Sequence, residues 1–315
     1  MSYKILITCP PMLKQIDSFR SIFSKYNFEA ETPNVVQTMS EGELIKMVPL
    51  YDGWIIGDDP ATYDVFRAGK SGRLKAAVKW GIGVDNVDFS ACKKLSIPIT
   101  NTPGMFGAEV ADLAMCYILG LARDAFYIDR EVRNGNWPKP SGISLNNKIL
   151  GIVGLGDIGL NIAKRAQAHG LKIIGWDPFI KEAPEYIDLY RNFPDEAKRC
   201  DFIVFACSLT DDTYYLLSDD TLSFLKRGVR IINVSRGPLI KESSLLKGLK
   251  NNIINSAALD VFENEPVLNE NDILKHPKCI VGSHNGSNTI EAVNRASNEA
   301  INILYNMLTH GKEHD

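Results

Sequence analysis

The stretch Gly151–Arg165, with the sequence GIVGLGDIGLNIAKR, decides the fold of this chain. Its first residues form an apolar run that predicts a buried strand, and its later residues have helical spacing. In the turn that joins them, Gly154-Leu-Gly156-Asp-Ile-Gly159, the glycines suit a tight turn, a close backbone approach to a pyrophosphate and the packing of helix on strand. The helix start offers N–H groups to phosphates. The stretch therefore predicts a dinucleotide-binding unit whose contacts come from Gly154, Gly156, Asp157, Ile158 and Gly159.

An acidic residue stands at the end of the strand predicted after this glycine turn. Asp177 follows the apolar run Leu171–Trp176 and stands eighteen residues after Gly159. That spacing suits a carboxylate that accepts hydrogen bonds from the adenosine ribose hydroxyls. Pro178 and Phe179 follow Asp177, so no arginine stands there for a 2′-phosphate. The sequence therefore predicts NAD as the cofactor.

Short apolar runs alternate with helical patterns on both sides of the fingerprint, which predicts parallel sheets covered by helices. Before it we expect a helix around Leu13–Lys25, a polar, turn-rich stretch between Gly57 and Leu74, and strands at Lys4–Thr8, Gly53–Gly57, Leu74–Trp80 and Ile97–Asn101. From the fingerprint onward we expect strands at Lys148–Val153, Leu171–Trp176, Asp201–Ala206, Arg230–Ser235, Asn255–Leu259 and Cys279–Gly282.

The central position of the fingerprint predicts the domain organisation. One α/β domain precedes the fingerprint, and the closing helix at Thr289–Leu308 has the pattern of a helix that docks on a sheet. We therefore expect two flavodoxin-like or Rossmann-like domains, with an NAD-binding domain at 101–285 inserted into a substrate domain of 1–100 plus 286–315. This organisation predicts a ligand cleft between them, at the carboxyl ends of the strands.

Composition excludes several other classes of protein. The net charge of −3, without any block of like charges, argues against nucleic-acid binding. The first residues lack the pattern of a signal peptide, and the apolar run Val110–Ala122 contains Asp112 and is too short to span a membrane. The six cysteines form no C-x-x-C pair and the five histidines have no metal-ligand spacing. We therefore expect a cytoplasmic protein without a metal.

Three later segments bring chemistry to the ends of the predicted strands. They are Asn233–Gly237 (NVSRG), Ala258–Pro266 (ALDVFENEP) and Gly282–Gly286 (GSHNG), and they offer a guanidinium, a carboxylate and an imidazole. Reducing a 2-keto acid needs a cation that binds the substrate carboxylate and polarises its carbonyl group. It also needs a group that titrates near neutral pH and a carboxylate that orients this group.

These segments, together with Lys79–Asp88 (KWGIGVDNVD) and Thr100–Gly104 (TNTPG), resemble the D-isomer-specific 2-hydroxyacid dehydrogenases, above all their phosphoglycerate-dehydrogenase-like branch. The resemblance covers nearly the whole chain. It implies that the protein transfers a hydride between NAD and C2 of a D-2-hydroxy acid or its 2-keto acid. The catalytic residues that it implies are Arg236, Glu265 and His284.

The same resemblance assigns further residues. It implies that the substrate is bound by Gly81, Ile82, Gly83, Asn101 and Arg236. It implies that the cofactor also contacts Cys207, Val234, Ser235, Asp260, His284 and Gly286, with Asp260 at the nicotinamide carboxamide. It places the helix Ala108–Arg123, which is apolar on more than one face, in a homodimer interface.

Two departures from the family pattern affect the expected function. Ala206–Thr210 (ACSLT) replaces a run like H-x-P-L-T beside the cofactor. Gly57–Pro60 (GDDP) stands where phosphoglycerate enzymes often carry an arginine for the substrate phosphate, and two acids there would repel a phosphate. Arg67, Lys70 and Arg73 are the candidates to replace that arginine.

Two alternatives therefore stay open beside the general dehydrogenase. One is a short D-3-phosphoglycerate dehydrogenase of serine synthesis. The other is a non-catalytic NAD-sensing protein, since corepressors of this fold keep the same arginine, glutamate and histidine.

Overall fold

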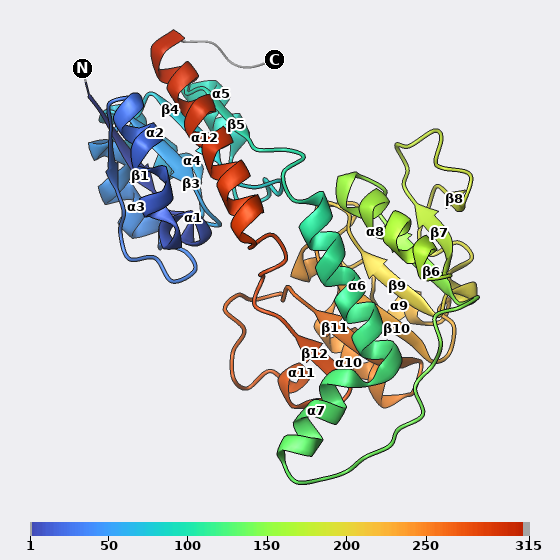
Figure 1. Ribbon diagram of the computed structural model, residues 1–315. Coiled ribbons are helices and arrows are strands. Elements are labelled where there is room, and N and C mark those ends of the chain that lie inside the picture. Colours follow the sequence, from blue (N-terminus) through green and yellow to red (C-terminus); the bar gives the residue numbers. More distant parts are fainter. Residues whose placement is uncertain (1, 311–315) are drawn as a thin grey trace. The chain divides into compact units, whose positions relative to one another are not determined.

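The computed structural model describes residues 2–310 and divides into two compact α/β units (Figure 1). The first unit comprises Met1–Phe106 and Asn288–Asp315, and the second comprises Gly107–Ser287. The second unit is thus one uninterrupted stretch inserted into the first. Both sheets are parallel throughout, which confirms the predicted fold class of two parallel-sheet α/β domains.

The first unit contains a five-stranded sheet in the order β2-β1-β3-β4-β5. This is the flavodoxin-like arrangement of a doubly wound sheet. Its strands β3 and β4 are buried along their whole length, as expected for apolar strands covered on both faces. The strands are β1 (Tyr3–Ile7), β2 (Phe28–Glu31), β3 (Gly53–Ile56), β4 (Ala76–Lys79) and β5 (Ile99–Asn101).

The helices of the first unit are α1 (Pro10–Lys14), α2 (Arg20–Lys25), α3 (Glu41–Met47), α4 (Tyr63–Ser71), α5 (Phe89–Leu95) and α12 (Ile290–His310). The closing helix α12 packs on β3 and β4. Trp80 Nε1 donates to Ser297 Oγ at 3.0 Å, and a Cβ on Gly53 would lie 3.0 Å from Leu304. The chain therefore returns to its first sheet after the second unit.

Two predictions for the first unit were wrong. The stretch between Gly57 and Leu74 is not turns alone, because α4 occupies most of it, capped by Thr62 and anchored by the buried Phe66. The single helix expected around Leu13–Lys25 is divided into α1, a 3₁₀ turn and α2, since Gln15 leaves the helical conformation.

The second unit contains a seven-stranded sheet in the order β12-β11-β10-β9-β6-β7-β8. Counted from β6, this is the 3-2-1-4-5-6 order of a dinucleotide-binding sheet with a seventh strand added. The strands are β6 (Ile149–Val153), β7 (Lys172–Trp176), β8 (Ile187–Tyr190), β9 (Phe202–Phe205), β10 (Val229–Asn233), β11 (Ile254–Leu259) and β12 (Cys279–Val281). The order reverses between β6 and β9, which is where such sheets bind ligands.

The helices of this unit are α6 (Gly107–Arg123), α7 (Ala125–Arg133), α8 (Asp157–Ala168), α9 (Asp219–Leu222), α10 (Glu242–Lys250) and α11 (Asp272–Lys275). The long helix α6 packs against α8, β10 and β11, which buries residues such as Val110, Ala114 and Ile118. Its other face leaves Leu119 and Cys116 exposed. Over residues 2–310, no helix has both the length and the apolar character needed to cross a membrane.

Candidate active site and cofactor site

The glycine turn after β6 has the shape that a pyrophosphate site needs. Gly154 has a φ of +92°, and a Cβ there would lie 2.6 Å from Cys207 Cα, so a side chain cannot be accommodated. A Cβ on Gly159 would clash with the carbonyl oxygen of Gly154, which keeps the start of α8 against the turn. A Cβ on Gly156 would meet nothing within 4 Å, so the backbone at the start of α8 is open to a ligand. These residues fit a dinucleotide.

Asp177 connects the turns that follow β6 and β7. Its Oδ2 accepts from Leu155 N at 3.0 Å, and its Oδ1 accepts from Phe179 N at 2.9 Å and from Ile180 N at 3.2 Å. The carboxylate is thereby fixed beside the glycine turn. The sequence predicted a ribose contact for Asp177 but not this bracing of the turn.

The loops after β9 and β10 meet beside Gly154. The Ser235 hydroxyl donates to the Cys207 carbonyl oxygen, and the neighbouring Val234 is buried. Burial raises the pKa of the Cys207 thiol to about 12, so the thiol is protonated at neutral pH. The loop Ala206–Thr210, whose sequence differs from the family pattern, is closed by Thr213. The Thr213 hydroxyl donates to Ser208 O at 2.8 Å.

Arg236 stands on a loop that the buried Asn233 shapes at the end of β10. The Asn233 side chain accepts from Ser235 N at 3.1 Å and donates to Arg236 O at 2.8 Å. The Arg236 guanidinium donates to Ser235 O at 2.8 Å. A Cβ on Gly237 would clash with the backbone of Phe262, so this glycine lets the arginine loop pack on the segment that carries Glu265.

Glu265 and His284 form a directly bonded pair. Glu265 Oε2 lies 2.6 Å from His284 Nδ1, and Glu265 Oε1 accepts from Phe262 N at 2.9 Å. Both side chains are about one quarter exposed, at 23% each. This geometry orients the imidazole through Nδ1, as a carboxylate does in other acid–base pairs.

Asp260 holds the backbone of the His284 loop. His284 has a φ of +53°, and its N–H donates to Asp260 O at 2.6 Å. The buried Asp260 carboxylate accepts from Asn285 N at 3.2 Å and from Gly286 N at 2.8 Å. It also accepts from the Tyr117 hydroxyl at 3.4 Å.

Tyr117 is a residue that the sequence analysis missed in this cluster. It lies on α6, 143 positions before Asp260, and only its place in the apolar pattern of that helix was visible. Burial and the adjacent carboxylate raise the pKa of Tyr117, so its hydroxyl remains a donor.

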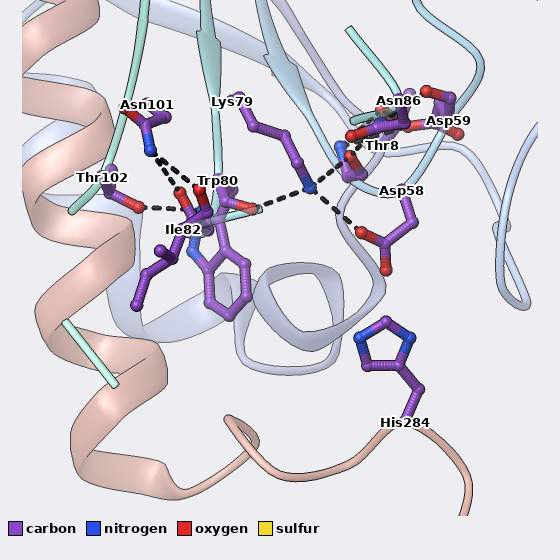
Figure 2. Close-up of polar contacts among 12 residues, drawn as sticks. Thr8, Asp58, Asp59, Lys79, Trp80, Ile82, Asn86, Asn101, Thr102 and His284 are labelled. Atoms are coloured by element: carbon purple, nitrogen blue, oxygen red, sulfur yellow. Dashed lines mark hydrogen bonds and ion pairs between the residues drawn. The ribbon is translucent and has the colours of Figure 1, made fainter. Parts of the chain in front are cut away.

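In the first unit, the predicted substrate loop follows β4 (Figure 2). Gly81 has a φ of +130°, and its N–H donates to Thr102 Oγ1 at 2.9 Å. The Asn101 amide donates to Gly81 O at 3.3 Å and to Ile82 O at 3.1 Å. Asn101 therefore shapes the loop, which is a role beside the predicted substrate contact.

Lys79, another residue that the sequence analysis did not assign, lies beside this loop and contacts the backbone of Trp80 (Figure 2). Its ammonium group is buried and donates to Gly57 O at 2.7 Å, to Asp58 Oδ1 at 3.0 Å and to Trp80 O at 3.2 Å. Asp59, the second acid of the segment Gly57–Pro60, is also buried and accepts from Gly57 N at 3.1 Å.

The three candidate cations for a substrate phosphate have other partners. Arg73 binds Asp52, which precedes β3, and Lys70 donates to Ser96 O, which precedes β5, so both lie toward the amino ends of the strands. Arg67 pairs with Asp64 in the exposed part of α4. Within residues 2–310 no cluster of three or more His, Cys, Asp or Glu side chains could hold a metal ion.

Comparisons with known proteins give a matching family model and several similar proteins. A family model described as D-isomer specific 2-hydroxyacid dehydrogenase, NAD binding domain, matches residues 115–286. The hydroxypyruvate reductase of Thermotoga maritima is 34% identical over 278 residues, which cover 86% of this chain and 89% of that protein. The D-3-phosphoglycerate dehydrogenase of Sus scrofa is 37% identical over 270 residues, and this chain spans about half of its length, 50%.

A similar solved structure is the TT0316 protein from Thermus thermophilus, with a TM-score of 0.87 and 28% identity over 98% of both chains. Another is a glyoxylate reductase from Paecilomyes thermophila, with a TM-score of 0.84 and 25% identity over 99% of this chain and 97% of that chain.

Proposed function

Since the chain belongs to the D-isomer specific 2-hydroxyacid dehydrogenase family, we propose that Arg236, Glu265 and His284 carry its reaction. The protein is an NAD-dependent oxidoreductase that interconverts a D-2-hydroxy acid and its 2-keto acid. The observation that supports the assignment most is the 2.6 Å contact between Glu265 and His284. Arg236 stands on the loop that packs against the same segment through Gly237.

Each catalytic side chain has one task in this proposal. NAD held by the glycine turn and Asp177 would supply the hydride-transfer chemistry at C2 of the substrate. In the direction of reduction, His284 Nε2 gives its proton to the carbonyl oxygen, and in oxidation the neutral imidazole takes it back. Glu265 stabilises the imidazolium form through Nδ1. The Arg236 guanidinium binds the substrate carboxylate and polarises the carbonyl group.

The remaining predicted contacts belong to the same proposal. The cofactor is held by the glycine turn, by Asp177 and by Cys207, Val234, Ser235, Asp260 and Gly286. The substrate carboxylate is held by the loop Gly81–Gly83, through the backbone N–H groups of Ile82 and Gly83, because the Gly81 N–H donates to Thr102 Oγ1. Asn101 lies beside this loop and shapes it. We accordingly propose that the first unit, predicted as 1–100 plus 286–315, is the substrate domain and that the second, predicted as 101–285, is the NAD-binding domain. The structure divides the chain between Phe106 and Gly107 and between Ser287 and Asn288.

We further propose that the protein is a cytoplasmic homodimer that associates through α6. A hollow of about 600 Å³ lies along this helix and is lined by residues that include Met115, Cys116, Leu119, Phe126 and Arg165. Its apolar lining favours a protein partner. The segment after α7 adds Trp137, which is 78% exposed. Neither nucleic acid nor a membrane is part of the proposed function.

The substrate we propose is a small, unphosphorylated 2-keto acid of the hydroxypyruvate or glyoxylate type. The names of the Thermotoga and Paecilomyes relatives support this class, as do the acids at Gly57–Pro60. The test is NADH consumption over a panel of glyoxylate, hydroxypyruvate, 3-phosphohydroxypyruvate and bulky branched keto acids. We expect the small unphosphorylated acids to be reduced fastest. Preference for 3-phosphohydroxypyruvate would instead support a short phosphoglycerate dehydrogenase, and NADH binding without turnover would support an NAD sensor.

A further inference from the structure

Arg191 lies beside Asp177, although fourteen positions separate the two residues in the sequence. Strands β7 and β8 are parallel neighbours in which Trp176 is paired with Tyr190 (Figure 1). The residues that follow, Asp177 and Arg191, therefore come to the same edge of the sheet. The Asp177 N–H donates to Tyr190 O at 3.1 Å, which continues the pairing by one residue. The fold thus brings an arginine to a strand end that has none in its own sequence.

The side chains of Asp177 and Arg191 bind opposite sides of one peptide unit. The Phe179 N–H donates to Asp177 Oδ1 at 2.9 Å, and Arg191 Nη1 donates to Pro178 O at 2.6 Å. The N–H and the C=O of a trans peptide point in opposite directions, so the carboxylate and the guanidinium lie on the two sides of this unit. The two distances and the width of a peptide unit keep Asp177 Oδ1 and Arg191 Nη1 less than about 8 Å apart.

Arg191 keeps its positive charge and most of its donors for a ligand. The residue is exposed, and within residues 2–310 it forms no ion pair and donates to Pro178 O alone. A guanidinium has five N–H donors in a planar fork, so the others can bind the oxygen atoms of a phosphate. The Asp177 carboxylate, in contrast, already accepts from three backbone N–H groups of its own turn.

Resting on the ribose contact proposed for Asp177, we propose that Arg191 is a second determinant of cofactor choice, which attracts the 2′-phosphate that Asp177 repels. The separation of the two side chains is within the Debye length of about 8 Å at physiological ionic strength, so both charges act on a group bound at the ribose. NADPH carries a phosphate at the 2′ position and gains from the guanidinium, whereas NADH carries a hydroxyl group and gains little. NAD stays the preferred cofactor, but the discrimination against NADPH is weaker than Asp177 alone would give.

The experiment measures the dissociation constants of NADH and NADPH, without substrate, from the change in nucleotide fluorescence on binding. R191A should weaken the binding of NADPH about fivefold and that of NADH less than about twofold, because only NADPH carries the 2′-phosphate. Both nucleotides are titrated into the same preparation, so a loss of folded protein cancels in the ratio of the two constants. The ratio therefore reports recognition of the phosphate and not the stability of the variant.

R227A is the matched control for R191A. Arg227 is another exposed arginine of the second unit that donates to a backbone carbonyl group, Asn251 O at 3.0 Å. It precedes β10 and so lies toward the amino ends of the strands, away from the glycine turn. R227A should therefore leave the ratio within about twofold of the wild type.

The variant D177N tests the opposing charge. Asparagine keeps one acceptor oxygen but removes the repulsion, so the ratio should shift toward NADPH by about tenfold. Adding R191A to D177N should weaken NADPH about fivefold again, because the remaining attraction comes from Arg191.

The inference is overturned if R191A weakens NADH and NADPH equally, because Arg191 would then only brace the turn after β7. It is also overturned if R191A and R227A give the same ratio. An unchanged ratio in D177N would refute the ribose contact of Asp177, and this inference with it. The binding constants do not depend on turnover: if R191A acts as expected but no 2-keto acid is reduced, the catalytic proposal fails and this inference stands.

Discussion

The two carboxylate oxygens of Glu265 have different partners: Oε1 accepts from the backbone N–H of Phe262, and Oε2 lies 2.6 Å from His284 Nδ1. The glutamate is thus oriented by its own loop before it orients the imidazole. Asp260 holds the backbone of His284 and of Gly286, so both the ring and the loop that carries it are positioned within the second unit.

The first prediction follows from this pair and concerns pH. Replacing Glu265 by Gln removes the negative charge beside His284 Nδ1 and should therefore lower the pKa of His284. Reduction needs the protonated imidazole, so its rate falls as pH rises through that pKa. Oxidation needs the neutral form, so its rate falls as pH drops through the same value. Both limbs should therefore move to lower pH in E265Q.

At neutral pH, E265Q should consequently lose more reductase than oxidase activity. Paired pH–rate profiles in both directions, for wild type and variant, measure this. Limbs that stay in place would show that Glu265 is only structural.

The second prediction concerns Arg236. R236K keeps the charge but loses the planar fork that matches a carboxylate. The loss of one charge-assisted hydrogen bond costs about 1.5–3 kcal/mol, so kcat/KM should fall roughly tenfold to more than a hundredfold. R20K, at an exposed pair on α2, is the matched control and should behave as wild type. Turnover of R236K near the wild-type level would remove Arg236 from the mechanism.

The third prediction concerns the choice of cofactor. Changing Asp177 to Ser and Pro178 to Arg removes a repulsive carboxylate and supplies a partner for a 2′-phosphate. The kcat/KM ratio of NADPH to NADH should rise. Because Asp177 also accepts from Leu155 N, affinity for both cofactors should decrease in the single variant D177S. A wild type that already prefers NADPH would contradict the assignment.

The fourth prediction uses Cys116 as a reporter of the proposed homodimer. Cys116 is the exposed cysteine, whereas burial raises the pKa of Cys92, Cys200, Cys207 and Cys279 to about 12. A dimer through α6 covers Cys116, so its reaction with a thiol reagent should be slow. L119E should dissociate the dimer and make the reaction fast.

Sedimentation at micromolar concentration provides the independent measure of association, and C116S identifies the reacting thiol. A monomeric wild type with a fast-reacting Cys116 would refute the α6 interface.

The sequence predicted the elements whose pattern is long or strongly apolar. The helices at Gly107–Arg123 and Ile290–His310 and most strands were located to within a few residues, because burial leaves a clear period in the sequence. The stretch at Glu41–Met47 and the edge strands β2 and β8 were missed. These segments are short and each has only one fully buried residue, so burial leaves little pattern in their sequence.

For the candidate site, motifs identified residue types but not their partners. The pairing of Tyr117 with Asp260 spans 143 positions, and that of Asp58 with Lys79 spans 21. Neither separation leaves a periodic signal. The roles of the glycines in the turn could be predicted from the sequence, because each glycine is required by steric constraints within the turn itself.

The insertion of the second unit into the first has a consequence for the order in which the protein is made. During synthesis, Gly107–Ser287 emerges as one piece and can complete its seven-stranded sheet while α12 is still inside the ribosome. The strands β3 and β4 emerge earlier but wait for α12 to cover them. The first unit is thus completed only after the second, and β3 and β4 lack the cover of α12 until then.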